Sequence, residues 1–207
     1  MRARSIGSVV VVLFAMFVAS GCKEPPTPQI QEARAAIDEM AQAAVDQWAP
    51  EAGEAARQAL AQVDAELKVQ GDKLGFLRDY EKTLQLVTAA KDAAAKAKAA
   101  AIEAKEKARA EATEAVAALE KSLADAQALL ATAPTGKGTE ADLEMMKADL
   151  EAVNAVVADA KASLEAEKFA EVASKVQAGL TRVEAVKTAI QQAIAAVTAA
   201  GAAPAAQ

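Results

Sequence analysis

The sequence contains no histidine, one cysteine, one tryptophan, one tyrosine and four phenylalanines among its 207 residues. Without histidine, the chain lacks the side chain that proteins use most often to transfer protons and to bind metal ions. The few aromatic rings also provide little of the large apolar area that usually fills a core. We therefore expect no enzyme, no cofactor, no metal site and no catalytic residues.

Alanine, in contrast, accounts for 59 residues. Together with Glu, Lys and Gln, alanine is the best helix-forming mixture available. Because its side chain buries little area, the core must depend on comparatively few Leu, Val, Ile and Met side chains. We predict an all-α fold: elongated antiparallel helical hairpins, or a coiled-coil-like bundle with one long central helix, after a cleaved signal peptide.

The amino-terminal segment has the order of a secretory signal. Arg2 and Arg4 precede an uncharged stretch over residues 6–19, and small residues follow. That order is typical of a signal peptide. The stretch is also shorter than the roughly 20 apolar residues of a membrane-spanning helix. We assign residues 1–21 to the signal, which places the only cysteine, Cys22, immediately after it.

The stretch Ala19-Ser20-Gly21-Cys22 resembles the lipobox of bacterial lipoproteins, with Ala19 where leucine is commonest. The resemblance implies cleavage before Cys22, a diacylglyceryl thioether on its sulfur, and an acyl chain such as palmitate on its new amino group. The partner of this residue is then the lipid bilayer. An ordinary signal with a stray exported cysteine is the alternative, but an unpaired thiol is unusual in an oxidising compartment.

Residues 22–28 contain three prolines and predict a short extended tether. The same resemblance implies that Lys23, in place of aspartate, sorts the protein to the outer membrane with its domain facing the periplasm. The mature chain would carry 21 basic and 29 acidic residues, a formal charge of −8. That charge argues against a nucleic-acid partner and against electrostatic adhesion to anionic lipid or acidic glycan strands.

A first helical region is predicted over residues 29–132. Pro50 restarts the chain after one helix, and Gly71, Asp72 and Gly75 predict a loose junction that reaches Arg78. The following segment, residues 78–131, has no proline or glycine and would span about 80 Å if it is unbroken.

The middle of this long segment, residues 88–101, has no large apolar side chain. Tyr80, Leu84 and Val87 form one apolar stripe before it, and a second stripe begins at Ile102. Continuing the first stripe by sevens leads to Lys91 and other lysines, so the register must change there. We interpret the stretch as weakly packed or bridging, and an alanine-faced close contact with a neighbouring helix is the alternative.

A second helical hairpin is predicted over residues 139–199, with a disordered tail over 200–207. Apolar residues spaced by three and four flank a short turn near 165–168, which is typical of an antiparallel helix pair. They are Leu143, Met146, Leu150, Val153, Val157, Ala160, Leu164, Phe169, Val172, Val176, Val183, Val186, Ile190 and Val197, with Gly179 in the same spacing between Val176 and Val183. The preceding "TGKGT" at 135–139 lacks the first glycine of a phosphate-binding loop, because Ala131 occupies that position.

The two halves resemble each other weakly, with Pro50 matching Pro134 and Tyr80 matching Phe169, which suggests a duplicated hairpin. The first copy also resembles an alanine-rich domain of unknown function found in bacterial lipoproteins, through Ala49-Pro50-Glu51, Gly71-Asp72 and Asp79-Tyr80. The resemblance implies a helical fold and an envelope location.

Two functions remain open from the sequence. The first is a membrane-anchored periplasmic lipoprotein that acts as a structural or spacer element of the cell envelope. The second is a helical interaction module that binds a periplasmic protein partner.

Overall fold

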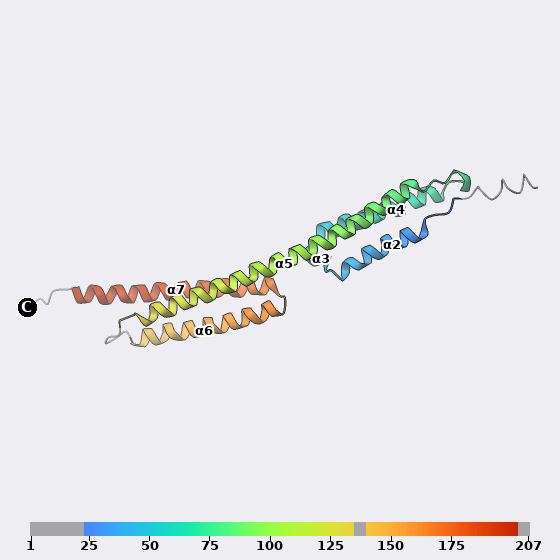
Figure 1. Cartoon of the computed structure of the whole chain (residues 1–207). Helices are drawn as coiled ribbons and strands as arrows, with labels where there is room; N and C mark the ends of the chain where they lie inside the picture. Colours follow the sequence, from blue (N-terminus) through green and yellow to red (C-terminus); the bar gives the residue numbers. More distant parts are fainter. Residues whose placement is uncertain (1–22, 135–139, 203–207) are drawn as a thin grey trace, which may run out of the picture. The chain divides into compact units, whose positions relative to one another are not determined.

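A computed structural model of the chain describes residues 23–134 and 140–202. Within these ranges every regular element is helical, so the prediction of an all-α fold is confirmed (Figure 1). The elements are α2 (Thr27–Asp38), η2 (Glu39–Ala41), α3 (Val45–Trp48), α4 (Pro50–Gly71), η3 (Gly75–Leu77), α5 (Glu81–Ala131), α6 (Glu140–Glu165) and α7 (Phe169–Ala202). The predicted long central helix is α5, which has 51 residues. No helix in the described part of the chain combines the length and hydropathy of a membrane span.

The described chain divides into two compact units inside α5, between Lys105 and Glu106. The first half of α5 therefore packs with the helices before it, and the second half packs with the helices after it. We call these parts unit 1 and unit 2.

Unit 1 is built from α2, α4 and the first half of α5, which lie side by side (Figure 1). Pro50 occupies the first turn of α4, where its missing N–H is not needed. One core cluster joins all three helices and consists of Ile30, Ala33, Val63, Val87 and Ala90. Short connections between the helices make α5 antiparallel to α4 in this unit.

The alanine-rich stretch of α5 is a close helix contact. Ala90, Ala94, Ala97 and Ala101 are fully buried. The last three pack in one cluster with residues of the α2–α4 segment, including Met40, Val45 and Trp48. Small side chains let helix axes approach closely, so the second of the two interpretations is correct and the bridging one is wrong.

Two members of the predicted apolar stripes on α5 face solvent: Leu84 is 40% exposed and Ile102 is 55% exposed. The predicted change of register within residues 88–101 is wrong, because the buried face of α5 continues through this stretch at a constant spacing of seven, at Tyr80, Val87, Ala94 and Ala101. Lys91 and Lys98 lie at the edge of the contact. Their ammonium groups pair with Glu32 at 2.6 Å and Glu39 at 2.8 Å.

Unit 2 contains the predicted antiparallel pair, α6 and α7. The buried side chains of its seam include Leu150, Val153, Val172 and Ile190. The turn between the helices places Glu167 at a φ of 57°, and Lys168 N–H donates to the Ser163 carbonyl at 2.9 Å. This bond closes the carboxyl end of α6 in the manner of a left-handed helix cap.

The second half of α5 is a third helix of unit 2, which the sequence pattern did not assign to this seam. Its Val116, Leu119, Leu123 and Ala126 are buried. Gly179 of α7 lies so close to Leu119 that an added Cβ would be 2.8 Å from the leucine Cδ2.

Two predicted boundaries are corrected by the helices. The first helical region begins at Thr27, two residues earlier than expected, so the tether ends at Pro26. The last helix continues to Ala202, so residues 200–202 belong to α7 and not to a disordered tail. Residues 203–207, the signal segment 1–21 and the "TGKGT" stretch lie outside the described residues.

Candidate functional site

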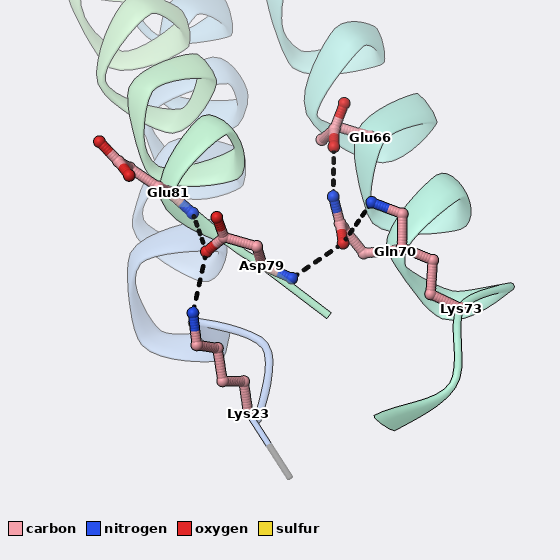
Figure 2. Close-up of polar contacts among 6 residues, drawn as sticks. All are labelled: Lys23, Glu66, Gln70, Lys73, Asp79 and Glu81. Atoms are coloured by element: carbon pink, nitrogen blue, oxygen red, sulfur yellow. Dashed lines mark hydrogen bonds and ion pairs between the residues drawn. The ribbon is translucent and has the colours of Figure 1, made fainter. Parts of the chain in front are cut away.

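The predicted site residue, Cys22, lies outside the described residues, but the residue bonded to it, Lys23, is described. Its Nζ lies 3.2 Å from Oδ1 of Asp79, just before α5 (Figure 2). The chain that leaves Cys22 therefore enters the fold beside the connection between α4 and α5, residues 72–80. We call this region, together with the last turn of α4, the tether end of unit 1.

A buried glutamine holds the tether end together. Gln70, in the last turn of α4, is only 4% exposed. Its Nε2 donates to Oε1 of Glu66 at 2.7 Å, and its Oε1 accepts from Lys73 Nζ at 3.1 Å and from Asp79 N–H at 3.0 Å (Figure 2). Because one side chain bonds to α4 and to both sides of the connection, it fixes where α5 starts relative to where α4 ends.

Arg78 closes the same connection from its other side. Its Nε donates to the Lys73 carbonyl at 3.1 Å and its NH2 group donates to the Gly71 carbonyl at 3.1 Å. The Gly71 carbonyl is among those that the end of α4 leaves without partners in the helix, and a cation is favoured near it. The junction predicted to be loose from its glycines is thus held by side-chain hydrogen bonds.

Two carboxylates at the tether end are stabilised in their charged form. The pKa of Asp79 is lowered, first by the hydrogen bond from Lys23 and then by the Glu81 N–H. The pKa of Glu66 is lowered by the hydrogen bond from Lys82, whose Nζ lies 2.6 Å from Oε2, and next by Gln70. Both acids should remain ionised well below neutral pH, so the network persists under ordinary conditions.

The connection also exposes large apolar side chains, which sequence reasoning missed. Leu74 is 63% exposed, Phe76 is 70% exposed and Leu77 is 58% exposed, and Val69 in the last turn of α4 is 51% exposed. The signal was present as "KLGFLR", since connections between helices are usually polar. The tripeptide Gly75–Leu77 forms the short helix η3, which gives these side chains a defined backbone.

The chemistry of the tether end is that of ion pairs, amide hydrogen bonds and an exposed apolar surface. Within residues 23–134 and 140–202, no three acidic, cysteine or histidine side chains converge as metal ligands would. Comparisons with protein-family models, with curated protein sequences and with solved structures found no match to this chain.

Proposed function

We propose that this chain is a lipoprotein of the bacterial cell envelope, anchored through lipid on Cys22, whose helical units act as a structural or spacer element. The observation that carries the proposal is the attachment of the tether. Only Lys23 to Pro26 separate Cys22 from α2, and Lys23 pairs with Asp79 at the tether end. Four residues span at most about 14 Å, so an anchor at Cys22 would be joined closely to the fold.

The composition supports a structural role rather than catalysis. The chain has no histidine, and its cysteine is used by the anchor in this proposal. Three-helix packing in each unit, with buried alanines and small apolar residues, produces long and narrow helical contacts. Such contacts suit an element that acts as a spacer in the cell envelope.

Membrane fractionation of a bacterium that expresses the full chain tests the anchor. Cys22→Ser should release the protein from the membrane fraction or leave its signal uncleaved. Mass spectrometry of the wild-type amino-terminal peptide should find Cys22 as the first residue with its acyl groups. The matched control is Cys22→Ser combined with Ala55→Cys, because Ala55 is exposed and this variant keeps one thiol in the chain.

The control separates a lipid anchor from a stray exported cysteine. Loss of membrane retention in both variants supports the lipid, because moving the thiol does not move the signal-processing site. Normal processing and retention of Cys22→Ser would contradict the proposal.

Sorting is tested by separating inner and outer membranes on a density gradient. The proposal places the wild-type protein in the outer membrane and predicts that Lys23→Asp moves it to the inner one. Lys23→Gln is the control, since it also removes the ion pair with Asp79 but introduces no aspartate. Equal distributions of both variants and wild type would contradict the sorting assignment.

Crosslinking in cells, followed by mass spectrometry, distinguishes a spacer from an interaction module. Photoreactive residues at exposed positions on each helix of unit 1 and unit 2 should give no single dominant protein product if the chain is a spacer. One partner crosslinked from one helix face would support the interaction module instead.

A further inference from the structure

The exposed apolar side chains of unit 1 are concentrated at the tether end. In the described part of the chain, the large apolar residues with substantial exposure include Val69, Leu74, Phe76 and Leu77, all within nine residues. The other such residues lie far apart in the sequence, at Leu84, Ile102, Met145 and Val197. Scattered exposed apolar residues are normal, whereas a cluster indicates a surface that binds something.

This cluster lies beside the point where the chain continues to Cys22. Lys23 is bonded to Cys22 and contacts Asp79, and Asp79 N–H is bonded to Gln70 of α4. Leu74, Phe76 and Leu77 lie in the chain between Gln70 and Asp79, and Val69 immediately precedes Gln70. Because Lys23 is bonded to Cys22, a lipid on Cys22 would bring a bilayer surface close to the α4–α5 connection.

The charge of this segment differs in sign from that of the whole protein. The tether end, residues 68–80, contains Lys68, Lys73 and Arg78 against two acids, Asp72 and Asp79, a formal charge of +1. The chain without residues 1–21 has a charge of −8. Basic side chains around exposed apolar residues are favoured at a membrane surface, because their long stems reach the headgroups while the apolar groups enter the lipid.

The connection is held in place before any binding occurs. Gln70 accepts a hydrogen bond from the backbone N–H of Asp79 (Figure 2). Arg78 donates to the backbone carbonyls of Gly71 and Lys73. An ordered segment loses less conformational entropy on binding than a flexible one. The exposure of Leu74, Phe76 and Leu77 is therefore a lasting property of this surface.

We infer that the α4–α5 connection, with Leu74, Phe76 and Leu77, inserts into the interface of the bilayer that holds the Cys22 lipid. The inference rests on the proposed lipid anchor. It gives unit 1 a second attachment to the membrane, besides the acyl chains, and so sets which end of unit 1 faces the lipid. A protein partner or a second copy covering the same residues is the competing occupant, and the test below distinguishes it.

Site-directed spin labelling of the full, anchored protein tests the inference. In the anchored protein the sulfur of Cys22 is alkylated, so an introduced cysteine is the only free thiol. The test variant is Phe76→Cys, and the control is Ala55→Cys on the exposed side of α4, about 24 Å along the helix from Gly71. Each labelled protein is reconstituted into vesicles of phosphatidylethanolamine and phosphatidylglycerol.

The measurement is the accessibility of each nitroxide to oxygen, which concentrates in lipid, and to a water-soluble nickel chelate. The inference predicts an oxygen-to-nickel ratio several-fold higher at residue 76 than at residue 55. Leu74→Gln with Leu77→Gln should reduce the ratio at residue 76 toward the control value. Ile102→Gln, an equally exposed site elsewhere on α5, should leave it unchanged. Circular dichroism verifies that each variant remains folded.

Each other outcome overturns the inference in a different way. A label at residue 76 that is as accessible to nickel as the label at residue 55 places the connection in water, and the lipid anchor stands. A label protected from both reagents identifies a protein contact in place of lipid. If the same preparation carries no acyl group on Cys22, the proposed anchor fails, and the inference fails with it.

Discussion

The packing of α5 against α7 in unit 2 can be tested through one glycine. Gly179→Ala would place a methyl carbon 2.8 Å from Cδ2 and 3.0 Å from Cδ1 of Leu119, which is fully buried. Overpacking of this kind costs about 1–3 kcal/mol, partly offset by about 1 kcal/mol because alanine favours a helix more than glycine does. Leu119→Ala alone should cost about 2–5 kcal/mol through the cavity that it leaves.

The double variant is the informative one. When Leu119 is already alanine, the methyl group at residue 179 has no clash, so Gly179→Ala should stabilise unit 2 by about 1 kcal/mol. The two substitutions should therefore be coupled by about 1–3 kcal/mol, in the range found for residues in direct contact.

Urea unfolding, followed by far-ultraviolet circular dichroism, measures this coupling, provided that the dependence on urea is the same for all variants. The control is Ala178→Gly at the exposed neighbouring position, which should cost about 1 kcal/mol in either background. If Gly179→Ala and Leu119→Ala add to within about 0.5 kcal/mol, α5 and α7 do not pack at this point and the third helix of unit 2 is wrongly assigned.

Three further predictions concern the seam of α6 and α7, the buried alanines and the response to acid. Leu150→Ala should destabilise the protein by about 2–5 kcal/mol in urea unfolding. Lys161→Ala breaks only an exposed ion pair between α6 and Glu120 of α5 and should cost about 1 kcal/mol or less; equal effects would contradict the seam. Ala94→Leu should cost about 1–3 kcal/mol of stability, because it overpacks a fully buried position. Ala95→Leu, on the exposed face, should change stability by about 0.5 kcal/mol or less. If both variants are tolerated, the alanine contact of α5 is refuted. Because the pKa of Glu66 is lowered in the folded state, its carboxylate stabilises the fold at pH values above the pKa of an unfolded glutamate, near 4.3. This stabilisation is lost as the pH falls through the lower pKa of the folded state. Glu66→Gln should therefore be less stable at pH 7 and lose less stability on acidification, and a parallel pH profile would contradict the network.

Some features of the candidate site could be predicted from the sequence, and others could not. The lipobox-like stretch at Ala19–Cys22 is a local pattern, so it predicts the anchor without any knowledge of the fold. The bonds of Gln70 and Arg78 were not predictable, because each joins groups that only the tertiary fold brings together. The exposed "KLGFLR" segment could have been noticed, but its position beside Lys23 depends on an ion pair between residues 56 positions apart.

The sequence by itself determined that the protein is helical and where most helices begin and end. Alanine with charged residues favours helices, and Pro50 and the glycines near residue 71 interrupt them, because these effects act within a few neighbouring residues. The spacing of large apolar residues also predicted the pairing of α6 with α7. It could not predict how alanine-rich surfaces pair, since alanine is compatible with both solvent and close contact. Only the tertiary structure decided that Ala94 and Ala97 are buried, that the second half of α5 joins unit 2, and that Leu119 packs on Gly179. Those contacts depend on which helix faces meet, and that choice is made by the packing of the whole unit.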